Sequence, residues 1–279
     1  MFTITNDLLI ATLLDPVDDR DRLGPRYCWG GYLHQLRDNE RRKLFSGPEF
    51  PARPSPFNGQ GAPEVFCHQN YYTGDTLNRE GDGGIILGVG AFDSIDREPV
   101  LSDLCEWRCD VEEAACTMTT EHEAYGWSYR LARNWELEGM TAISSTRIEN
   151  QGEKELKVLW FPHPFYPLVK GGMVFRINLP VDMQENPGFR KKGNRISMIP
   201  GFDWETGRLE WLEGDFDGPL DATFRHPVTD TVTMSGDMPI SHLPLWANAH
   251  TISLESYSYH RLEAGESCDW SIRYCFGLH

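Results

Sequence analysis

The sequence predicts an all-β protein in which many short strands form a sandwich or a barrel. Residues 127–137 alternate large apolar side chains with mostly polar ones, interrupted on the apolar face only by Arg133, and residues 268–276 repeat the pattern. Alternation with a period of two is typical of a strand that buries one face. The 279-residue chain also contains 26 Gly, 18 Pro and nine Trp. This composition favours turns and strands over long helices.

Further strand candidates follow one another along the chain, separated by turn signals such as Glu80–Gly84 and 150–152. These candidates are residues 7–14, 84–91, 104–118, 140–149, 156–161, 173–179, 208–212, 231–235 and 251–258. Residues 108–116 are the best helix candidate, but their Cys and Val content is equally typical of a strand. We therefore expect no helix of three or more turns.

Residues 45–63 interrupt this pattern with five prolines, which leave little room for regular structure. Because Phe45, Phe50 and Phe57 are spread through the segment, we expect a loop that packs apolar side chains onto a sheet rather than a free linker. The chain shows no internal repeat and no domain-scale change in composition. We therefore predict a single domain over residues 1–279.

The net charge of −16 argues against several partners. The densest basic runs, 41–43 and 190–192, span three residues each, so we expect neither nucleic acid nor a membrane as a partner. The chain has no apolar run near the ~20 residues of a membrane span, and no basic segment and apolar stretch of a secretory signal at its start. Seven cysteines, with no zinc-type pair after Cys105 and Cys109, predict free thiols in the cytoplasm and no metal site.

Two segments contain candidate catalytic residues, in a chain that lacks a P-loop, a His-Glu-x-x-His run and a Gly-x-Ser-x-Gly elbow. In residues 159–166, His163 lies between Pro162 and Pro164, which restrict the backbone and so fix where the imidazole is directed. A His held in this way suits proton transfer or a hydrogen bond to a sugar. The alternative is a structural His at the end of a strand.

The second segment is residues 243–257. If a strand runs on from Thr251, then Ser253, Glu255 and Tyr257 share one of its faces. A carboxylate between a Ser and a Tyr can serve as a general base when that face borders a cleft. The alternative is an ordinary Glu that faces solvent.

The order of these segments resembles the aldose 1-epimerase (galactose mutarotase-like) superfamily. Residues 145–152 end in Asn-Gln-Gly and residues 159–166 in His-Pro-Phe-Tyr, similar to the Asn-x-Gly and His-Pro-Tyr/Phe strand ends of that superfamily. Residues 245–255 look like its penultimate strand, which contains the catalytic Glu, and residues 262–267 look like its closing turn. The resemblance covers most of the chain in the order of its elements.

The resemblance implies a β-supersandwich of antiparallel sheets that binds a small-molecule carbohydrate in a groove. It implies that Glu255 takes the proton of the anomeric hydroxyl while His163 supplies or stabilises the proton at the ring oxygen. The ring then opens and closes as the other anomer. This isomerase reaction requires an acid and a base, but neither a metal nor an organic cofactor. Trp246 and Tyr166 are the candidates to stack on the sugar.

The family commonly has two further site residues, an earlier His and an early substrate-binding Arg. The matching segment 87–92 has no His, and His68 falls before it. Residues 60–64 occupy about the place of the Arg, which makes Gln60 and Glu64 the substrate-binding candidates there. A second hypothesis is therefore a non-catalytic carbohydrate-binding or regulatory protein on the same fold. A third is a carbohydrate lyase or hydrolase, which would need a paired carboxylate or a Tyr/His set on one face of a sheet.

Overall fold

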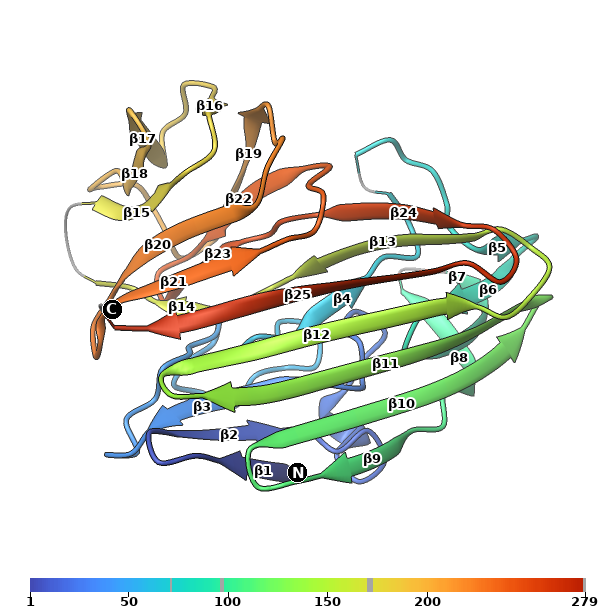
Figure 1. Ribbon diagram of the computed structural model, residues 1–279. Coiled ribbons are helices and arrows are strands. Elements are labelled where there is room, and N and C mark those ends of the chain that lie inside the picture. Colours follow the sequence, from blue (N-terminus) through green and yellow to red (C-terminus); the bar gives the residue numbers. More distant parts are fainter. Residues whose placement is uncertain (71, 96–97, 170–172, 278–279) are drawn as a thin grey trace.

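The computed structural model describes residues 1–70, 72–95, 98–169 and 173–277. Apart from the short 3₁₀ helix η1 (Arg20–Arg22), its regular elements are all β-strands (Figure 1). The all-β prediction is therefore confirmed. Within the described ranges, no helix has the length and apolar character that a membrane crossing requires.

A ten-stranded antiparallel sheet forms the larger layer of the molecule (Figure 1). Its strands, in spatial order, are β17 (Phe189–Lys192), β18 (Arg195–Met198), β15 (Met173–Ile177), β20 (Leu220–His226), β21 (Asp230–Gly236), β25 (Ser267–Phe276), β12 (Thr141–Asn150), β11 (Trp127–Glu138), β10 (Ala115–Ala124) and β9 (Arg108–Val111). Buried and more accessible residues alternate along β11, so one face of the sheet is turned toward the core.

Four smaller sheets complete the fold, and the described strand pairs in them are antiparallel. A three-stranded sheet contains β24 (Ser258–Leu262), β13 (Leu156–Pro162) and β4 (Glu64–Phe66). A five-stranded sheet contains β14 (Tyr166–Pro167), β23 (Thr251–Leu254), β22 (Leu243–Ala247), β19 (Arg208–Gly214) and β16 (Val181–Met183). A four-stranded sheet contains β5 (Arg79–Glu80), β6 (Gly83–Ile86), β7 (Gly90–Ile95) and β8 (Pro99–Leu104). A second three-stranded sheet contains β1 (Phe2–Thr5), β2 (Leu9–Leu13) and β3 (Leu33–Asp38).

The core lies between the ten-stranded sheet and the smaller ones. Trp270 of β25 packs on Trp160 of β13, with ring centroids 5.0 Å apart. Farther along the same layer, Phe224 of β20 stacks on Tyr166 of β14 at 4.4 Å. Aromatic pairs at these separations stabilise a core beyond the area that they bury. The architecture is thus a β-sandwich of packed antiparallel sheets.

Most predicted strands are confirmed, and three runs differ from their prediction. The predicted strand 84–91 is two strands, β6 and β7, because the chain turns at Gly88, whose positive φ of 74° favours glycine. The predicted strand 104–118 is interrupted, because β8 ends at Leu104 and β9 and β10 follow as two separate antiparallel strands; of the two alternatives for residues 108–116, the strand is confirmed. The run 251–258 leaves the sheet after Leu254, so Glu255 follows the end of β23 instead of lying within it.

The proline-rich loop is anchored at both ends, since Phe45 is buried at its start and residues 59–63 are buried at its end, where the N–H of Ala62 donates to the carbonyl of Leu33 at 2.9 Å. Phe45 is buried and packs edge-on against Tyr274 of β25, with ring centroids 5.8 Å apart. Phe50 is half-buried, and Phe57 is 55% exposed. The prediction that apolar side chains hold the loop on a sheet is therefore confirmed for Phe45 and wrong for Phe57.

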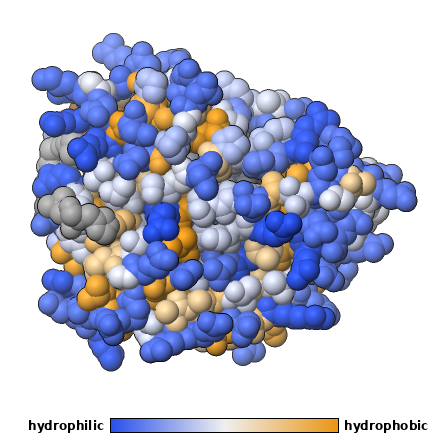
Figure 2. Space-filling view, viewed as in Figure 1, coloured by the Kyte–Doolittle hydropathy of each residue, from blue (hydrophilic) through white to orange (hydrophobic). Residues whose placement is uncertain are grey.

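The surface is mainly hydrophilic on the face shown in Figure 2, where hydrophobic residues form small patches between hydrophilic ones. This distribution accords with the acidic composition. Four cysteines, Cys28, Cys67, Cys105 and Cys116, are buried free thiols, and burial raises the pKa of each of them. Their side chains therefore stay protonated and pack as small apolar groups. The cytoplasmic location stays a prediction.

Candidate functional site

A cavity of about 450 Å³ is lined by the predicted base, Glu255, and by several aromatic side chains. This volume is within the range of pockets that bind small molecules. The lining residues come from β4, β7, β8, β13, β19, β22 and the loops between them: Pro25, Arg26, Phe57, Val65, Phe66, Cys67, His68, Gln69, Ile95, Glu98, Pro99, Phe161, Leu209, Trp211, Trp246, Glu255 and Tyr257. We call this cavity the inner cavity.

Glu255 is held in the wall of the inner cavity by its own backbone. Its N–H donates to the carbonyl of Pro244 at 2.9 Å, and the N–H of Tyr257 donates to that of His242 at 2.9 Å. The side chain is buried, which raises its pKa to about 7, although Arg26 and a hydrogen bond from Tyr257 both act to lower it. At neutral pH the carboxyl group is therefore divided between its acid and its base forms.

His163 lies directly against Glu255. Its Nε2 is 3.3 Å from Glu255 Oε1 and 3.3 Å from Nη2 of Arg26. The backbone N–H of His163 donates to the carbonyl of Pro63 at 2.8 Å, and the ring packs on Phe165 at 4.4 Å. Burial, reinforced by the charge of Arg26, holds the pKa of the imidazole well below its usual range. His163 is therefore neutral at pH 7, and its Nε2 lies beside both the Glu255 carboxyl group and the guanidinium of Arg26.

The structure thus brings the two predicted catalytic residues together. Glu255 lines the inner cavity, whereas His163 lies behind it and is not among the lining residues. The Nδ1 atom of His163 has no hydrogen-bond partner among the described residues. A solvent-facing Glu does not fit the burial of Glu255. A structural His at the end of a strand stays an alternative, because His163 directly follows β13 and is buried.

Arg26 is a site residue that the sequence did not indicate. Its guanidinium lies over the rings of Tyr27 and Phe57, at 5.1 and 4.8 Å from their centroids, and donates to the carbonyl of Phe57 at 2.9 Å. It therefore brings a positive charge to the cavity wall beside Glu255 and His163. The resemblance placed a substrate-binding Arg near residues 60–64, whereas Arg26 lies in a loop before β3, and no local pattern marks it.

The candidates Gln60 and Glu64 lie elsewhere in the structure. Gln60 is buried and its amide is 3.3 Å from both the ring Nε2 and the carbonyl oxygen of His34. Glu64 is buried in an ion pair with Arg133 at 2.5 Å and also accepts a hydrogen bond from Trp160. Neither side chain lines the inner cavity. The amide nitrogen of Gln60 and the carboxylate oxygens of Glu64 are engaged with protein groups, so the geometry does not support a role in substrate binding.

Of the two aromatic candidates, Trp246 lines the inner cavity and Tyr166 does not. Trp246 of β22 lines the inner cavity, and its ring centroid is 6.2 Å from that of His163. Tyr166 is fully buried between Phe45 and Phe224. It belongs to the core because its strand, β14, faces the ten-stranded sheet. Trp246 therefore remains the candidate to stack on a sugar, and Tyr166 does not line the site.

His68 also lines the inner cavity. Its pKa is lowered by burial and by the charge of Arg79, so the imidazole is neutral at pH 7. Sequence position alone placed His68 ahead of the segment where the second His was expected. The wall of the cavity is completed by a stacked pair, Phe161 and Tyr257, with ring centroids 4.2 Å apart. Flat apolar faces and a few polar groups are typical of ligand sites.

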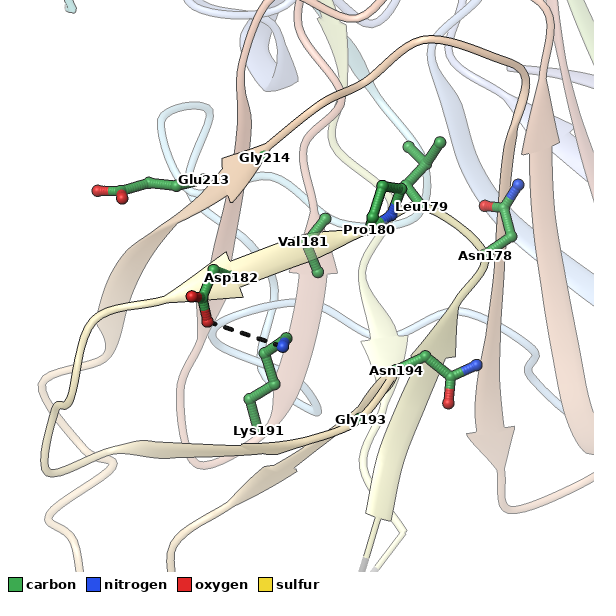
Figure 3. A pocket seen from close by; sticks show the side chains of 10 residues that line it. All are labelled: Asn178, Leu179, Pro180, Val181, Asp182, Lys191, Gly193, Asn194, Glu213 and Gly214. Atoms are coloured by element: carbon green, nitrogen blue, oxygen red, sulfur yellow. Dashed lines mark ion pairs between the residues drawn. The ribbon is translucent and has the colours of Figure 1, made fainter.

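A larger depression, of about 610 Å³, lies near β16 and β17 and is a weaker candidate (Figure 3). Its charged groups Asp182 and Lys191 pair with each other at 3.7 Å. The Asn178 side chain is already bonded to the carbonyl of Pro219 and the N–H of Asp221. Because these polar groups are already engaged with one another or with the backbone, the inner cavity, which contains the buried Glu255, is the better candidate. Among the described residues, no group of three or more His, Cys, Asp or Glu could hold a metal ion.

Comparison with solved structures identifies the fold as galactose mutarotase-like. A galactose mutarotase-like protein from Lactobacillus casei ATCC 334 is 16% identical over 99% of both chains, with a TM-score of 0.66. A galactose mutarotase-like protein from Clostridium acetobutylicum is 12% identical over 99% of this chain and 95% of its own, with a TM-score of 0.58. A protein from Escherichia coli K12, provisionally assigned as an aldose 1-epimerase, is 14% identical over 100% of this chain and 99% of its own, with a TM-score of 0.60.

These likenesses confirm the fold that the resemblance implied. No family model matches the sequence, and no curated protein matches it. At identities of 12–16%, these likenesses show the fold alone.

Proposed function

We propose that the protein is a carbohydrate isomerase of the aldose 1-epimerase type, which interconverts the anomers of a sugar. One observation supports this most strongly: a buried carboxyl group, Glu255, has its pKa raised to about 7 and opens on a cavity walled by aromatic rings. A general base is most effective when its pKa is near the working pH. A pKa moved this far by burial is also typical of functional sites.

In the proposed reaction, the Glu255 carboxylate removes the proton of the anomeric hydroxyl. The bond between C1 and the ring oxygen breaks, and the proton that Glu255 has taken passes to the ring oxygen, while the neutral imidazole of His163 stabilises the protonated carboxyl group. The Nε2 of His163 lies 3.3 Å from the carboxylate, and the two reacting oxygens of the sugar are attached to the same carbon. Rotation of the aldehyde and reversal of both proton transfers then give the other anomer. No redox or group-transfer step is involved.

A second candidate function is carbohydrate binding without turnover on the same fold. It is favoured by one observation, that His163 lies behind Glu255 and is not among the residues that line the inner cavity. A protein of this kind would bind a sugar between the aromatic walls but would lack direct proton delivery to the ring oxygen.

The test that separates the two functions is anomer exchange measured by NMR magnetisation transfer over a panel of free aldoses. We expect exchange faster than in buffer alone for at least one sugar. Binding of a sugar without faster exchange would support the second function. The absence of both binding and exchange over the whole panel would contradict both.

The rate of exchange should rise with pH through about 7. The mechanism uses the carboxylate form of Glu255, whose pKa is about 7, while His163 stays neutral because its pKa is well below its usual range. The measurement is kcat/KM between pH 5.5 and 8.5 after subtraction of buffer catalysis, since its midpoint reports the free enzyme. A midpoint near 4.5, the ordinary value of a Glu, would contradict the assignment of Glu255 as base.

Trp246→Ala should lower kcat/KM by about three- to tenfold, mainly through a higher KM. The reason is the loss of one aromatic surface of the inner cavity, and an aromatic contact contributes about 0.5–1.5 kcal/mol. Trp204→Ala is the matched control, because Trp204 packs on Phe189 and Phe202 outside the cavity. An equal fall in both variants would show that the effect is on folding and not on the sugar.

A further inference from the structure

A second cavity, of about 400 Å³, adjoins the inner cavity and shares Trp211 with it. Its other lining residues include Tyr72, Gln184, Glu213, Phe216 and His242. We call it the outer groove. The outer groove contains neither Glu255 nor His163, so the proposed proton transfers leave it without a function.

Strand β19 explains how one residue reaches both cavities. Leu209, Trp211 and Glu213 lie at alternate positions of this strand and so share one face. Leu209 lines the inner cavity, Glu213 lines the outer groove, and Trp211 between them lines both. The two cavities therefore follow one another along a single strand face.

A row of aromatic rings connects the two cavities. From the inner cavity, Phe161 stacks on Tyr257 at 4.2 Å, and Tyr257 lies 6.4 Å from Trp211. Trp211 is 5.5 Å from Tyr72, and Tyr72 is 4.3 Å from His242. Each distance joins two ring centroids. A sugar ring has an apolar C–H face that can pack on such rings, so the row offers consecutive stacking surfaces that begin beside Glu255.

Tyr72 is the most exposed large hydrophobic residue of this row, with 64% of its surface accessible. Phe57 and Leu209, which line the inner cavity, are also exposed. Large apolar side chains that gather around a cavity in this way are typical of a ligand-binding groove. A monosaccharide held against Glu255 would leave Tyr72 uncovered, whereas a longer ligand would cover it.

The polar groups of the outer groove fit a neutral ligand that is rich in hydroxyls. Gln184 donates to Glu213 Oε1 at 3.1 Å, and the exposed Glu213 carboxylate is an acceptor for hydroxyl groups. No Lys or Arg is among the described residues that line the groove. The negative charge of this exposed carboxylate disfavours phosphorylated and acidic sugars.

From these contacts we propose that the substrate is a neutral oligosaccharide with a free reducing end. Its reducing residue occupies the inner cavity against Glu255, and the next residue crosses Trp211 into the outer groove against Tyr72 and His242. This proposal rests on the proposed function, because it assumes that the anomeric centre is presented to Glu255.

The experiment compares each monosaccharide with disaccharides that end in it. The probes are glucose with maltose and cellobiose, and galactose with β-1,4-galactobiose. Calorimetry gives Kd and NMR magnetisation transfer gives kcat/KM for the wild type. We expect at least one disaccharide to bind about tenfold more tightly than its reducing-end monosaccharide, and its kcat/KM to be higher by a similar factor.

Tyr72→Ala should lower the disaccharide-to-monosaccharide ratio at least fivefold. Tyr125→Ala is the matched control, since Tyr125 is exposed and lines neither cavity, and it should keep the wild-type ratio. A wild-type ratio of one or less in both measurements, or an unchanged ratio in Tyr72→Ala, would overturn the proposal.

The possible outcomes test the oligosaccharide groove and the isomerase reaction independently of each other. Faster exchange of monosaccharides alone would leave the isomerase standing and overturn the oligosaccharide groove. Tighter disaccharide binding without faster exchange of any sugar would support the groove and overturn the isomerase. No binding and no exchange with every probe would overturn both.

Discussion

Glu255→Gln is expected to lower the rate of anomer exchange by about a thousandfold. The amide keeps the size and most of the hydrogen bonding of the carboxyl group, but it cannot accept the proton of the anomeric hydroxyl, and general acid–base catalysis contributes roughly 10²–10⁴ in rate. The measurement is kcat from NMR magnetisation transfer at pH 8, where the wild-type carboxyl group is mostly ionised.

The same variant should be more stable than the wild type above pH 7. The pKa of Glu255 is raised from 4.5 to about 7 by burial, so the folded state binds this proton more tightly than the unfolded state does. The stability that this proton provides is complete below pH 4.5 and is lost as the pH rises through 7. Gln has no such proton to lose, and at pH 8 its advantage reaches up to about 3 kcal/mol.

Glu123→Gln is the control for both measurements, because Glu123 is exposed on β10 and outside the cavity. It should leave the exchange rate and the pH dependence of unfolding near those of the wild type. A Glu255→Gln protein that is folded and retains wild-type exchange on every active sugar would contradict the role of Glu255 as base. Loss of activity together with a lower free energy of unfolding at pH 8 would instead indicate a structural role.

The sequence predicted the Glu–His pair but not its surroundings. Glu255 and His163 lie in segments with recognisable local order, a strand end and a Pro-His-Pro run. Arg26, His68 and Trp211 reach the same cavity from segments that are far apart in the chain. Their meeting depends on how strands of different sheets are placed, and the local pattern of a strand does not contain that information.

The ends of strands could be predicted from the sequence only where one face of the strand is buried. Period-two alternation predicted β11 and β25 nearly to their ends, since each has one buried face. In the region around Glu255, all residues from Thr251 to Ser258 are buried, so no alternation marks the end of β23 at Leu254. Where both faces are buried, periodicity no longer distinguishes strand from loop.

Arg133, the one residue that interrupts the apolar face of β11, shows how an anomaly in a pattern can identify a buried polar network. The side chain lies in the core and pairs with Glu64 at 2.5 Å. It also donates to Ser144 at 3.0 Å and to Thr146. Trp160 and Ser144 donate to the Glu64 carboxylate at 2.7 and 2.5 Å. The network therefore joins β11 and β12 of the large sheet to β4 and β13 of the small one.

Breaking this network should be the most destabilising single change in the chain outside the apolar core. Either Glu64→Gln or Arg133→Met leaves a buried charge without its partner, and such a loss costs about 3–5 kcal/mol. The double variant should lose clearly less than the sum of the two single losses, because neither charge remains. The measurement is urea unfolding of the four proteins as a double-mutant cycle. Additive losses would contradict a direct pair.

The same cycle decides between two roles for Glu64. As a substrate-binding residue, it would change KM when replaced by Gln, with little effect on unfolding. As a core residue held by Arg133 and Trp160, it should lower the free energy of unfolding and leave the KM of the remaining folded protein within about twofold of the wild type. We expect the second result, because the carboxylate is 1% exposed and its oxygens already accept hydrogen bonds from three side chains. A sugar would have to displace these donors to reach it, at the cost of leaving the buried Arg133 unpaired.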